Sequence, residues 1–493
     1  MSVHLVRGPF EEVSPGVFRL AFDGSGFGWR SRDAWFVAST PGDGRVRAAV
    51  QAGTLRVPYP SPDGRAQSLR FEPPEVVGLF TDRVPLSAGA ESGLPVQFAV
   101  VSGPANVENG FLRLTRRPER SPWPAEIRVV ALQPGGGGWK ATEPAYRTLR
   151  VEPPPRKPFV HPGLLDSRAE LDDVRARIQR GEEPWASRWK ALLASDELSP
   201  RHHPSPRAHV VRDLGGRWEG SFELGLDSRR AYSHALAWAL GGDPEHARRA
   251  AEFLDAWSEK LLSLSGHDAR LLAGITGHKF CNAAELLRHT GAAWPADRQT
   301  RFRDMMRRVY VPLCRDFYPE ANGNWDASMI LTLMSIGVHL DDHDLFRRAV
   351  EYALHGEGNG AIPRYINPAG VCQESARDQQ HTQLGLGFLA DACETAWTQG
   401  VDLYAAFDNR LATGFEFTAG YNLGAEAPDG VKVSPDGRGR FRPVYARVVS
   451  HYRGRLGIAM PKSVAAAARA PSDALQWDHL PWQALTEEKP AKR

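Results

Sequence analysis

The chain has 493 residues, and its 61 Lys and Arg nearly balance its 58 Asp and Glu, giving a formal net charge of +3. This balance argues against a nucleic-acid coat or a general polyanion binder and leaves room only for a local basic cleft. Hydrophobic residues make up 42% and charged residues 24%, as in soluble globular proteins of two or three domains. No run is long and apolar enough to span a membrane, and the N-terminus has no signal-peptide core.

The first 152 residues predict β structure. Runs of alternating apolar and polar residues, separated by frequent Gly and Pro, indicate strands at 17–22, 46–50 and 127–132. We divide this part into a small β module at 1–68 and a β-sandwich at 69–152. The proline-rich segment 153–159 that follows predicts a stiff linker.

From residue 160 to residue 493 the sequence predicts helices. Asp166 and Ser167 can cap a helix that runs to Ile178, and Asp243-Pro244 can start another. Further predicted helices are 228–240, 278–290, 298–314, 325–339, 343–354, 376–397, 400–421 and 443–456. Short turns between helices of similar length fit antiparallel hairpins. We therefore predict a mainly α protein, an α/α toroid or incomplete α/α barrel preceded by β-sandwich modules.

Residues 374–381, Glu-Ser-Ala-Arg-Asp-Gln-Gln-His, form the most informative stretch. It is dense in polar and charged groups where a helix is predicted to begin. At helical spacing, Glu374, Arg377 and His381 share one face. A carboxylate, a guanidinium and an imidazole together suit an anionic substrate. The alternative is a solvated helix start with an ion pair.

Several segments carry a resemblance to a known family. They are His161-Pro-Gly-Leu-Leu, Ala256-Trp257-Ser258, Phe280-Cys-Asn282-Ala-Ala-Glu285, Asn322-Gly-Asn324-Trp325, Gln373 to His381, and Arg442-Pro443. In this order, over about residues 160–460, they resemble the alginate-lyase superfamily of polysaccharide lyases. Within it the chain looks like the glucuronan and alginate lyases of polysaccharide lyase family 38. The resemblance implies cleavage of a 4-linked uronic-acid polysaccharide by β-elimination, without a metal or other cofactor in the chemical step.

The chain departs from the better-known bacterial alginate lyases at one motif. Those enzymes carry an Asn-Asn-His run, whereas here the matching place reads Asn322-Gly323-Asn324-Trp325. The imidazole would instead come from His381, as in the family 38 pattern. In the first part of the chain, residues 93–107 resemble bacterial Ig-like modules attached to extracellular carbohydrate-active enzymes. This likeness implies an extracellular or periplasmic protein.

β-Elimination requires a neutralised carboxylate, a base and an acid. Asn324 can donate to the carboxylate, although it is equally suited to cap a helix. Arg377 or Arg442 can pair with the carboxylate, or with Glu374 or Asp378. His381 is the candidate base, its alternative being a core histidine. In the resembling lyases tyrosine is the acid, which leaves Tyr445 and Tyr452, each also suited to packing. The residues assigned to substrate binding are Glu374, Gln380, Asn322, Trp325, Arg217 and Trp218.

No metal site is predicted. The four cysteines, of which Cys372 and Cys393 could also form a disulfide, fit no metal spacing and suit buried free thiols. His202, His203 and His209 lie in a proline-rich stretch that suits a loop. The run Asp341-Asp342-His343-Asp344 resembles a cation cluster but fits a helix cap better.

Two other functions compete with a lyase that binds an anionic polysaccharide or oligosaccharide. A glycoside hydrolase on the same toroid needs two carboxylates, which Glu374 with Asp326 or Asp378 could supply. A non-catalytic glycan-binding protein would bind without turnover. The abundance of Arg, His, Asn and Tyr around the motif favours elimination.

Overall fold

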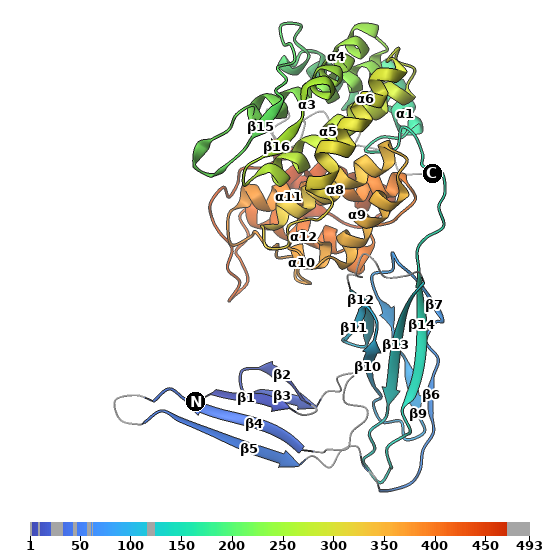
Figure 1. The fold of residues 1–493 in the computed structure, drawn as a ribbon, viewed down its shortest axis with the longest axis vertical. Helices are drawn as coiled ribbons and strands as arrows, with labels where there is room; N and C mark the ends of the chain where they lie inside the picture. Colours follow the sequence, from blue (N-terminus) through green and yellow to red (C-terminus); the bar gives the residue numbers. More distant parts are fainter. Residues whose placement is uncertain are drawn as a thin grey trace. The chain divides into compact units, whose positions relative to one another are not determined.

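The computed structural model describes residues 2–7, 10–20, 33–42, 47–56, 61, 63–115 and 124–470. It divides the chain into two compact units, Met1–Pro155 and Arg156–Arg493. The first unit is built of strands and the second mainly of helices (Figure 1). This agrees with the predicted fold class, a mainly α toroid preceded by β modules.

The β unit begins with a three-stranded antiparallel sheet of order β1-β4-β5 and a hairpin of β2 and β3. Their bounds are β1 Ser2–Arg7, β2 Phe10–Ser14, β3 Val17–Leu20, β4 Asp33–Thr40 and β5 Ala49–Arg56. The remaining strands are β6 Leu69–Phe71, β7 Val76–Gly78, β8 Val84–Pro85, β9 Ala88–Ala90, β10 Gln97–Ser102, β11 Ala105–Glu108, β12 Phe111–Leu114, β13 Ala125–Leu132 and β14 Ala145–Glu152.

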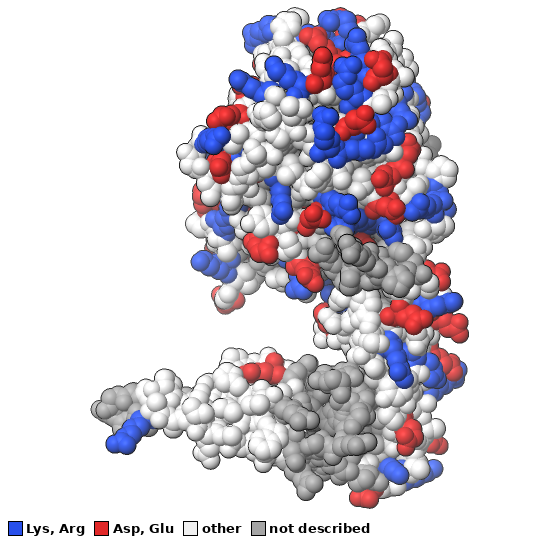
Figure 2. Space-filling view, viewed as in Figure 1, with Lys and Arg blue, Asp and Glu red and all other residues white. Residues whose placement is uncertain are grey.

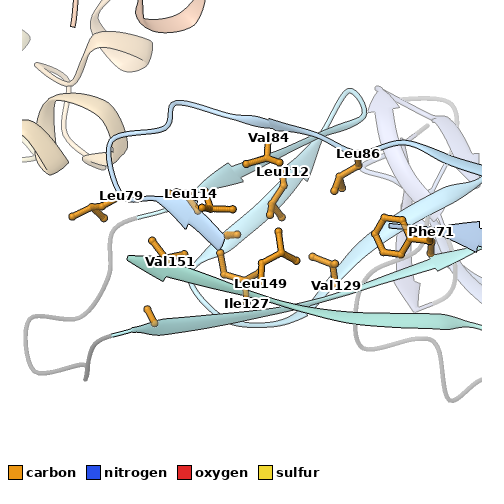
Figure 3. Close-up of a cluster of buried hydrophobic side chains, with 14 residues drawn as sticks. Phe71, Leu79, Val84, Leu86, Leu112, Leu114, Ile127, Val129, Leu149 and Val151 are labelled. Carbon is orange, nitrogen blue, oxygen red and sulfur yellow. The ribbon is translucent and has the colours of Figure 1, made fainter. Parts of the chain in front are cut away.

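Residues 69–152 form a sandwich around one apolar core. The sheet β10-β13-β14-β7 supplies Ile127, Val129, Leu149 and Val151, and the sheet β11-β12-β8 supplies residues such as Leu112 (Figure 3). Strand β13 starts with strict alternation of buried and exposed residues, as expected for a strand with one face in a core. The predicted strand 127–132 is therefore confirmed. Residues 21, 22 and 46, which the other two predicted strands include, lie outside the described residues.

The second unit contains fourteen α-helices within its described residues. They are α1 Arg168–Gln179, α2 Trp185–Leu193, α3 Ser221–Gly241, α4 Pro244–Lys260, α5 Ala269–His289, α6 Ala296–Met305, α7 Val311–Cys314, α8 Gly323–His339, α9 His343–His355, α10 Ile362–Tyr365, α11 Gln379–Thr398, α12 Ala406–Asn422, α13 Tyr445–Val449 and α14 Pro461–Arg469. Two short strands, β15 His209–Val211 and β16 Ser263–Ser265, pair in parallel.

Helices α3, α5, α8 and α11 pack side by side as an inner row (Figure 1). Helices α5 and α8 run in parallel: Thr332 Oγ1 donates to Gly274 O at 2.6 Å, and towards the other end Glu285 lies 2.8 Å from His339. The pairing of β15 with β16 places the start of α3 near the start of α5. The intervening α4, α6 and α9 return the chain between them. This in-and-out course is that of an α/α toroid and brings the N-termini of the inner helices to one end.

Two predicted helices are interrupted in the structure. The predicted helix 298–314 contains a π-helical segment at Met306–Tyr310, and the predicted helix 443–456 becomes π-helical at Ser450–Arg455. The first helix is capped by Ser167, whose side chain and that of Glu170 form a capping box. The cap at Ser167 confirms the predicted start of that helix.

The segment that follows Pro155 is anchored to the helices. Arg156 pairs with Asp344 at 3.0 Å, and the ring of Phe159 stacks on His343 with centroids 4.2 Å apart. Val160 N donates to Gln399 Oε1 at 2.9 Å. Residues 156–159, which we assigned to the linker, therefore belong with the helical unit.

All four cysteines are buried free thiols, and burial raises the pKa of each. They are therefore inert core residues, as expected from their spacing, and Cys372 and Cys393 form no disulfide. None of the helices that the structure describes has the length and apolar composition needed to cross a membrane. Basic and acidic side chains are intermixed over the visible face of the helical unit (Figure 2).

Candidate active site

Several of the predicted site residues lie at the end of the toroid where the inner helices begin. Arg217 and Trp218 precede α3, Asn324 lies in the first turn of α8, and the 374–381 stretch leads into α11. Backbone N–H groups at helix N-termini carry partial positive charge and favour anions. This end of the inner row is therefore suited to a carboxylate ligand.

Glu374 is fully buried at the centre of this group. Its Oε2 accepts from the backbone N–H of Asn324 at 3.1 Å and from the hydroxyl of Tyr365 at 3.4 Å. Its Oε1 accepts from Arg377 Nη1 at 2.8 Å. Burial raises the pKa of Glu374 to about 7, against the opposing effect of Arg377. Glu374 thus ties the start of α8 to the turn before α11.

Arg377 links Glu374 to His381. Its Nη2 lies 3.2 Å from His381 Nε2, while His381 Nδ1 lies 2.7 Å from Asp378 Oδ2. The side chains of Arg377 and His381 are 41% and 37% exposed, so both can reach a ligand. A fully buried carboxylate therefore holds an exposed guanidinium beside an exposed imidazole.

The predicted reason for this grouping is wrong, although the grouping is correct. We expected Glu374, Arg377 and His381 to share a face of a helix starting at 376. Helix α11 instead begins at Gln379, because the Asp378 side chain caps it by accepting from His381 N at 2.7 Å. Glu374 and Arg377 lie in the preceding turn and meet His381 through Arg377.

Asn324 is held beside Glu374 by its backbone. Its side chain is buried, and among the described residues Oδ1 has no hydrogen-bond partner. The alternative reading of Asn324 as a helix cap is wrong, since Asn322 occupies the N-cap position of α8. Because buried amide oxygens are rarely left unpaired, this one is expected to bind a ligand or water. Asn322 itself lies 3.5 Å from Gln373 Nε2, and Gln373 Oε1 accepts from Gly323 N at 2.9 Å.

Two glycines allow the close packing behind the site. A Cβ at Gly323 would lie 2.3 Å from a ring carbon of Tyr365, and one at Gly385 would lie 2.2 Å from the Tyr365 hydroxyl. Tyr365 therefore fills the space between α8 and α11 and reaches Thr382 O at 3.0 Å. Any larger residue at Gly323 or Gly385 would move one helix and displace Glu374.

Gln380, predicted to contact substrate, holds a neighbouring loop. Its Nε2 donates to Arg440 O at 2.7 Å, and Gln383 Nε2 donates to the same carbonyl at 3.0 Å. Arg442 is mostly buried, and its backbone N–H donates to Gln383 Oε1 at 3.0 Å. The glutamines of α11 thereby fix the 434–442 segment, which carries the exposed Arg440, next to the site.

Both candidate acid tyrosines lie in the core. Tyr445 is 0% exposed and donates to Gln383 Oε1 at 2.9 Å; Tyr452 is 0% exposed and donates to Tyr404 O at 2.7 Å. Burial raises the pKa of both hydroxyls. We expected one of them at the rim of the cleft, but Tyr445 in α13 and Tyr452 in the π-helical segment that follows are both buried. The geometry therefore supports a structural role for both.

A chain of contacts leads from Trp218 to the site. Arg212 lies over the Trp218 ring at 5.3 Å and 3.4 Å from Asp268 Oδ2. Asp268 Oδ1 lies 2.7 Å from His267 Nδ1, and the His267 ring meets the edge of Trp325 with centroids 5.5 Å apart. Trp218 is 53% exposed, whereas Arg217 pairs with Glu219 at 2.9 Å. The structure thus joins the predicted Trp218 and Trp325 through residues before α5.

Sequence reasoning missed His267 and Tyr318. The Tyr318 ring lies 5.8 Å from Trp325, and the Arg270 guanidinium lies 5.1 Å from the Tyr318 ring. Neither residue sits in a recognisable motif. Their only signal is position, since each lies shortly before an inner helix of the toroid.

The histidines and acids considered for a metal have other partners. His202 pairs with Asp196 at 2.9 Å, His203 with Glu252 at 3.5 Å, and His209 with Ser263 at 2.9 Å. Asp342 caps α9 by accepting from Asp344 N and Leu345 N, as predicted.

Comparisons of the sequence and of the structure with known proteins both find alginate lyases. The family model described as Alginate lyase matches residues 220–428. The helical unit is therefore similar, over this segment, to the alginate lyases. The matched segment contains Asn324, Glu374, Arg377 and His381, while Arg442 and Tyr445 lie beyond it.

Among solved structures, alginate lyase A1-III from Sphingomonas species A1 matches with a TM-score of 0.50 at 18% identity, over 66% of this chain and 98% of that chain. An alginate lyase from Bacteroides ovatus gives 0.47 at 15% identity, over 67% of this chain and 100% of that chain. A variant of A1-III complexed with tetrasaccharide gives 0.49 at 17% identity, over 66% and 97%. None of the curated proteins matches the chain. The A1-III likeness supports the toroid fold of the helical unit.

Proposed function

We propose that this chain is a polysaccharide lyase of the alginate-lyase superfamily and cleaves a 4-linked uronic-acid polysaccharide of alginate or glucuronan type by β-elimination. The observation that carries the proposal is the group at the start of α8 and α11. There the backbone N–H of Asn324 donates to Glu374, and Glu374 positions the exposed Arg377 beside the exposed His381. Helix N-termini, an amide and a guanidinium together suit the carboxylate of a uronate.

The first requirement of elimination is neutralisation of that carboxylate. Arg377 is 41% exposed, and its Nη2 faces a ring nitrogen rather than a carboxylate. A substrate carboxylate can take this donor, because a charged hydrogen bond to an anion is stronger than one to a neutral imidazole. The Asn324 amide would donate to the second oxygen. Neutralisation makes the proton on C5 acidic.

The exchange also frees the base. When Arg377 turns to the substrate, His381 Nε2 loses its donor and its lone pair is exposed. His381 takes the C5 proton on Nε2, and Asp378 stabilises the resulting cation at Nδ1, 2.7 Å away. The electrons of the C5–H bond form the C4–C5 double bond, and the C4–O4 bond breaks. The departing O4 then requires a proton.

We assign the proton donor to His267 rather than to a tyrosine. His267 is 44% exposed, its Nδ1 is held by Asp268 at 2.7 Å, and it contacts Trp325, the neighbour of Asn324. A partly exposed imidazole oriented by a carboxylate is suited to general acid catalysis. Tyr318 also contacts Trp325 and is the alternative proton donor that the experiment below distinguishes from His267.

The positions of the candidate carboxylates do not favour a hydrolase. Asp326 is buried and accepts from Tyr352 at 2.6 Å and from Tyr318 N at 2.7 Å. Asp378 caps α11 and binds His381, and Glu374 is fully buried. Hydrolysis needs two carboxyl groups facing the glycosidic bond. Each of these three is already committed to the protein itself.

The test is a panel of mannuronan, guluronan, glucuronan and a glycosaminoglycan, followed by ultraviolet absorbance of the unsaturated uronate. A lyase gives absorbance, a hydrolase gives new reducing ends without it, and a binding protein gives neither. His267→Ala should lower turnover by about 10²-fold or more, and Tyr318→Phe should stay within a few-fold. If Tyr318→Phe is the damaging variant, the acid is Tyr318. Polysaccharide substrates fit an extracellular or periplasmic location, which fractionation of the native host would test.

A further inference from the structure

A histidine and carboxylate cluster lies at the opposite end of the inner helices. His161 in the entry segment, with Glu285 and His289 in the last turns of α5, offers ligand atoms that all lie within 4.8 Å of one another. Glu285 is buried, and the His161 side chain is 15% exposed. Sixteen residues of α5 separate Ala269 from Glu285, which is about 24 Å along the helix at 1.5 Å per residue. The cluster is therefore separate from the proposed active site.

The three side chains face one another closely. His161 Nδ1 lies 2.8 Å from Glu285 Oε2, and His289 Nε2 lies 3.7 Å from Glu285 Oε1. The His161 and His289 rings are stacked with centroids 4.4 Å apart. Ligands about 2.1 Å from a tetrahedral metal are separated by roughly 3.4 Å, a value between these two nitrogen–oxygen distances. Because an imidazole binds a metal in its ring plane, one of the stacked rings would rotate when all three side chains bind one ion.

One ring nitrogen of the cluster, His289 Nε2, lacks a hydrogen-bond partner among the described residues. It is buried and faces the Glu285 carboxylate. A buried polar atom without a partner is uncommon and calls for a ligand. A ligand bound by Glu285 and His161 at the same time would supply the partner that this nitrogen lacks.

The surroundings resemble the second layer of a metal site. His161 Nε2 lies 3.1 Å from Asp341 Oδ1, and His339 Nδ1 lies 2.8 Å from Glu285 Oε1. Carboxylates that orient metal-binding imidazoles are a regular feature of zinc proteins. Arg288 and Arg303 lie 3.8 and 3.9 Å from Asp341 Oδ2, so their charge is directed at that outer carboxylate. The C-terminal ends of α5 and α8 also favour a cation.

We propose that His161, Glu285 and His289 bind a divalent transition-metal ion of the zinc type. Two imidazoles and one carboxylate suit such an ion and not Ca²⁺ or Mg²⁺, which prefer oxygen ligands. The ion would fasten the entry segment to α5, because His161 belongs to the first and the other two ligands to the second. Its role is structural, stabilising the folded helical unit by mass action.

The test uses full-length, untagged protein dialysed against chelator and then against Zn²⁺. Elemental analysis should find one zinc per chain, and the melting temperature should rise over the metal-free form. His289→Phe keeps a ring to stack on His161 but removes the ligand nitrogen, so it should lose both the bound zinc and the rise. His203→Ala is the matched control, because His203 is 71% exposed and pairs with Glu252 on α4. It should keep both.

A second variant and a second metal ion complete the experiment. His289→Ala repeats the measurement if the Phe ring disturbs folding, which circular dichroism of the metal-free forms would reveal. Ca²⁺ in place of Zn²⁺ should give no rise. Equal zinc content and equal melting shifts in wild type and either His289 variant would overturn the proposal. Because zinc content and melting are measured without substrate, the result is independent of the proposed lyase activity.

Discussion

Nη2 of Arg377 lies 3.2 Å from Nε2 of His381. An arginine side chain is always charged and only donates, so this ring nitrogen must accept. The ring proton therefore sits on Nδ1, 2.7 Å from Asp378 Oδ2. In this arrangement the accepting nitrogen of the imidazole is covered by the Arg377 guanidinium.

His381→Ala is expected to lower turnover on the best polyuronate by about 10²–10⁴-fold, the scale of a lost general base. The side chain is 37% exposed, so the melting temperature should change little. Steady-state kinetics and circular dichroism melts check this, with His203→Ala as the unaffected control. A large loss of stability in His381→Ala would instead identify a packing histidine.

Glu374 makes stability depend on pH. Burial raises its pKa to about 7 from 4.5, so between these values the folded protein binds more protons than the unfolded chain. The unfolding free energy should therefore fall as pH rises from 4.5 through about 7, by about 3 kcal/mol at most. Glu374→Gln should remove this slope from thermal melts at several pH values.

The control for Glu374 is Glu426→Gln, because the Glu426 side chain is 87% exposed. Its melting curves should follow the pH dependence of the wild type. If Glu374→Gln keeps the wild-type slope, Glu374 is ionised throughout the window, and the Arg377 ion pair outweighs burial.

Tyr445→Phe and Tyr452→Phe should both cost stability rather than catalysis. Each loses one buried hydrogen bond, to Gln383 Oε1 or to Tyr404 O, worth about 1 kcal/mol. Turnover should stay within a few-fold of wild type. Denaturant melts and kinetics on the same samples decide the point. A 10²-fold loss of turnover at unchanged stability in either variant would restore that tyrosine as the acid.

The sequence predicted the toroid because periodicity and cap residues are local signals. Ser167 begins its helix as expected, and Asp342 caps α9. The grouping of Glu374, Arg377 and His381 was also predicted, although through a helical face that does not exist. Arg377 bridges the pair because it is long enough to span the turn before Asp378.

The remaining parts of the site depend on packing that spacing does not reveal. Tyr445 and Tyr452 lie seven residues apart, which suggested one face of a continuous helix. The helix is not regular, because Ser450–Arg455 is π-helical. Both tyrosine rings lie in the core and neither faces a cleft. His267 meets Trp325 only because α5 and α8 run in parallel, a tertiary contact with no sequence motif.

The boundary between the units can be tested with two fragments. A fragment of residues 156–493 keeps the Arg156–Asp344 ion pair, the stack of Phe159 on His343 and the contact of His161 with Glu285. A fragment of residues 164–493 loses all three. We expect the longer fragment to fold and cleave polyuronate, and the shorter one to melt several degrees lower. Equal melting temperatures would show that the entry segment contributes no stability, and failure of both would make the β unit part of the fold.

Exhaustive chelation should leave the elimination reaction intact. Arg377 and the N-termini of α8 and α11 supply the positive charge that a uronate carboxylate needs, so under the proposed mechanism the step requires no metal. Loss of an ion from the His161 cluster would lower the melting temperature, yet the turnover of molecules that remain folded should persist. Initial rates below the melting transition, before and after EDTA, measure this. Rates abolished by EDTA and restored by calcium would show that a metal neutralises the substrate and that Arg377 does not.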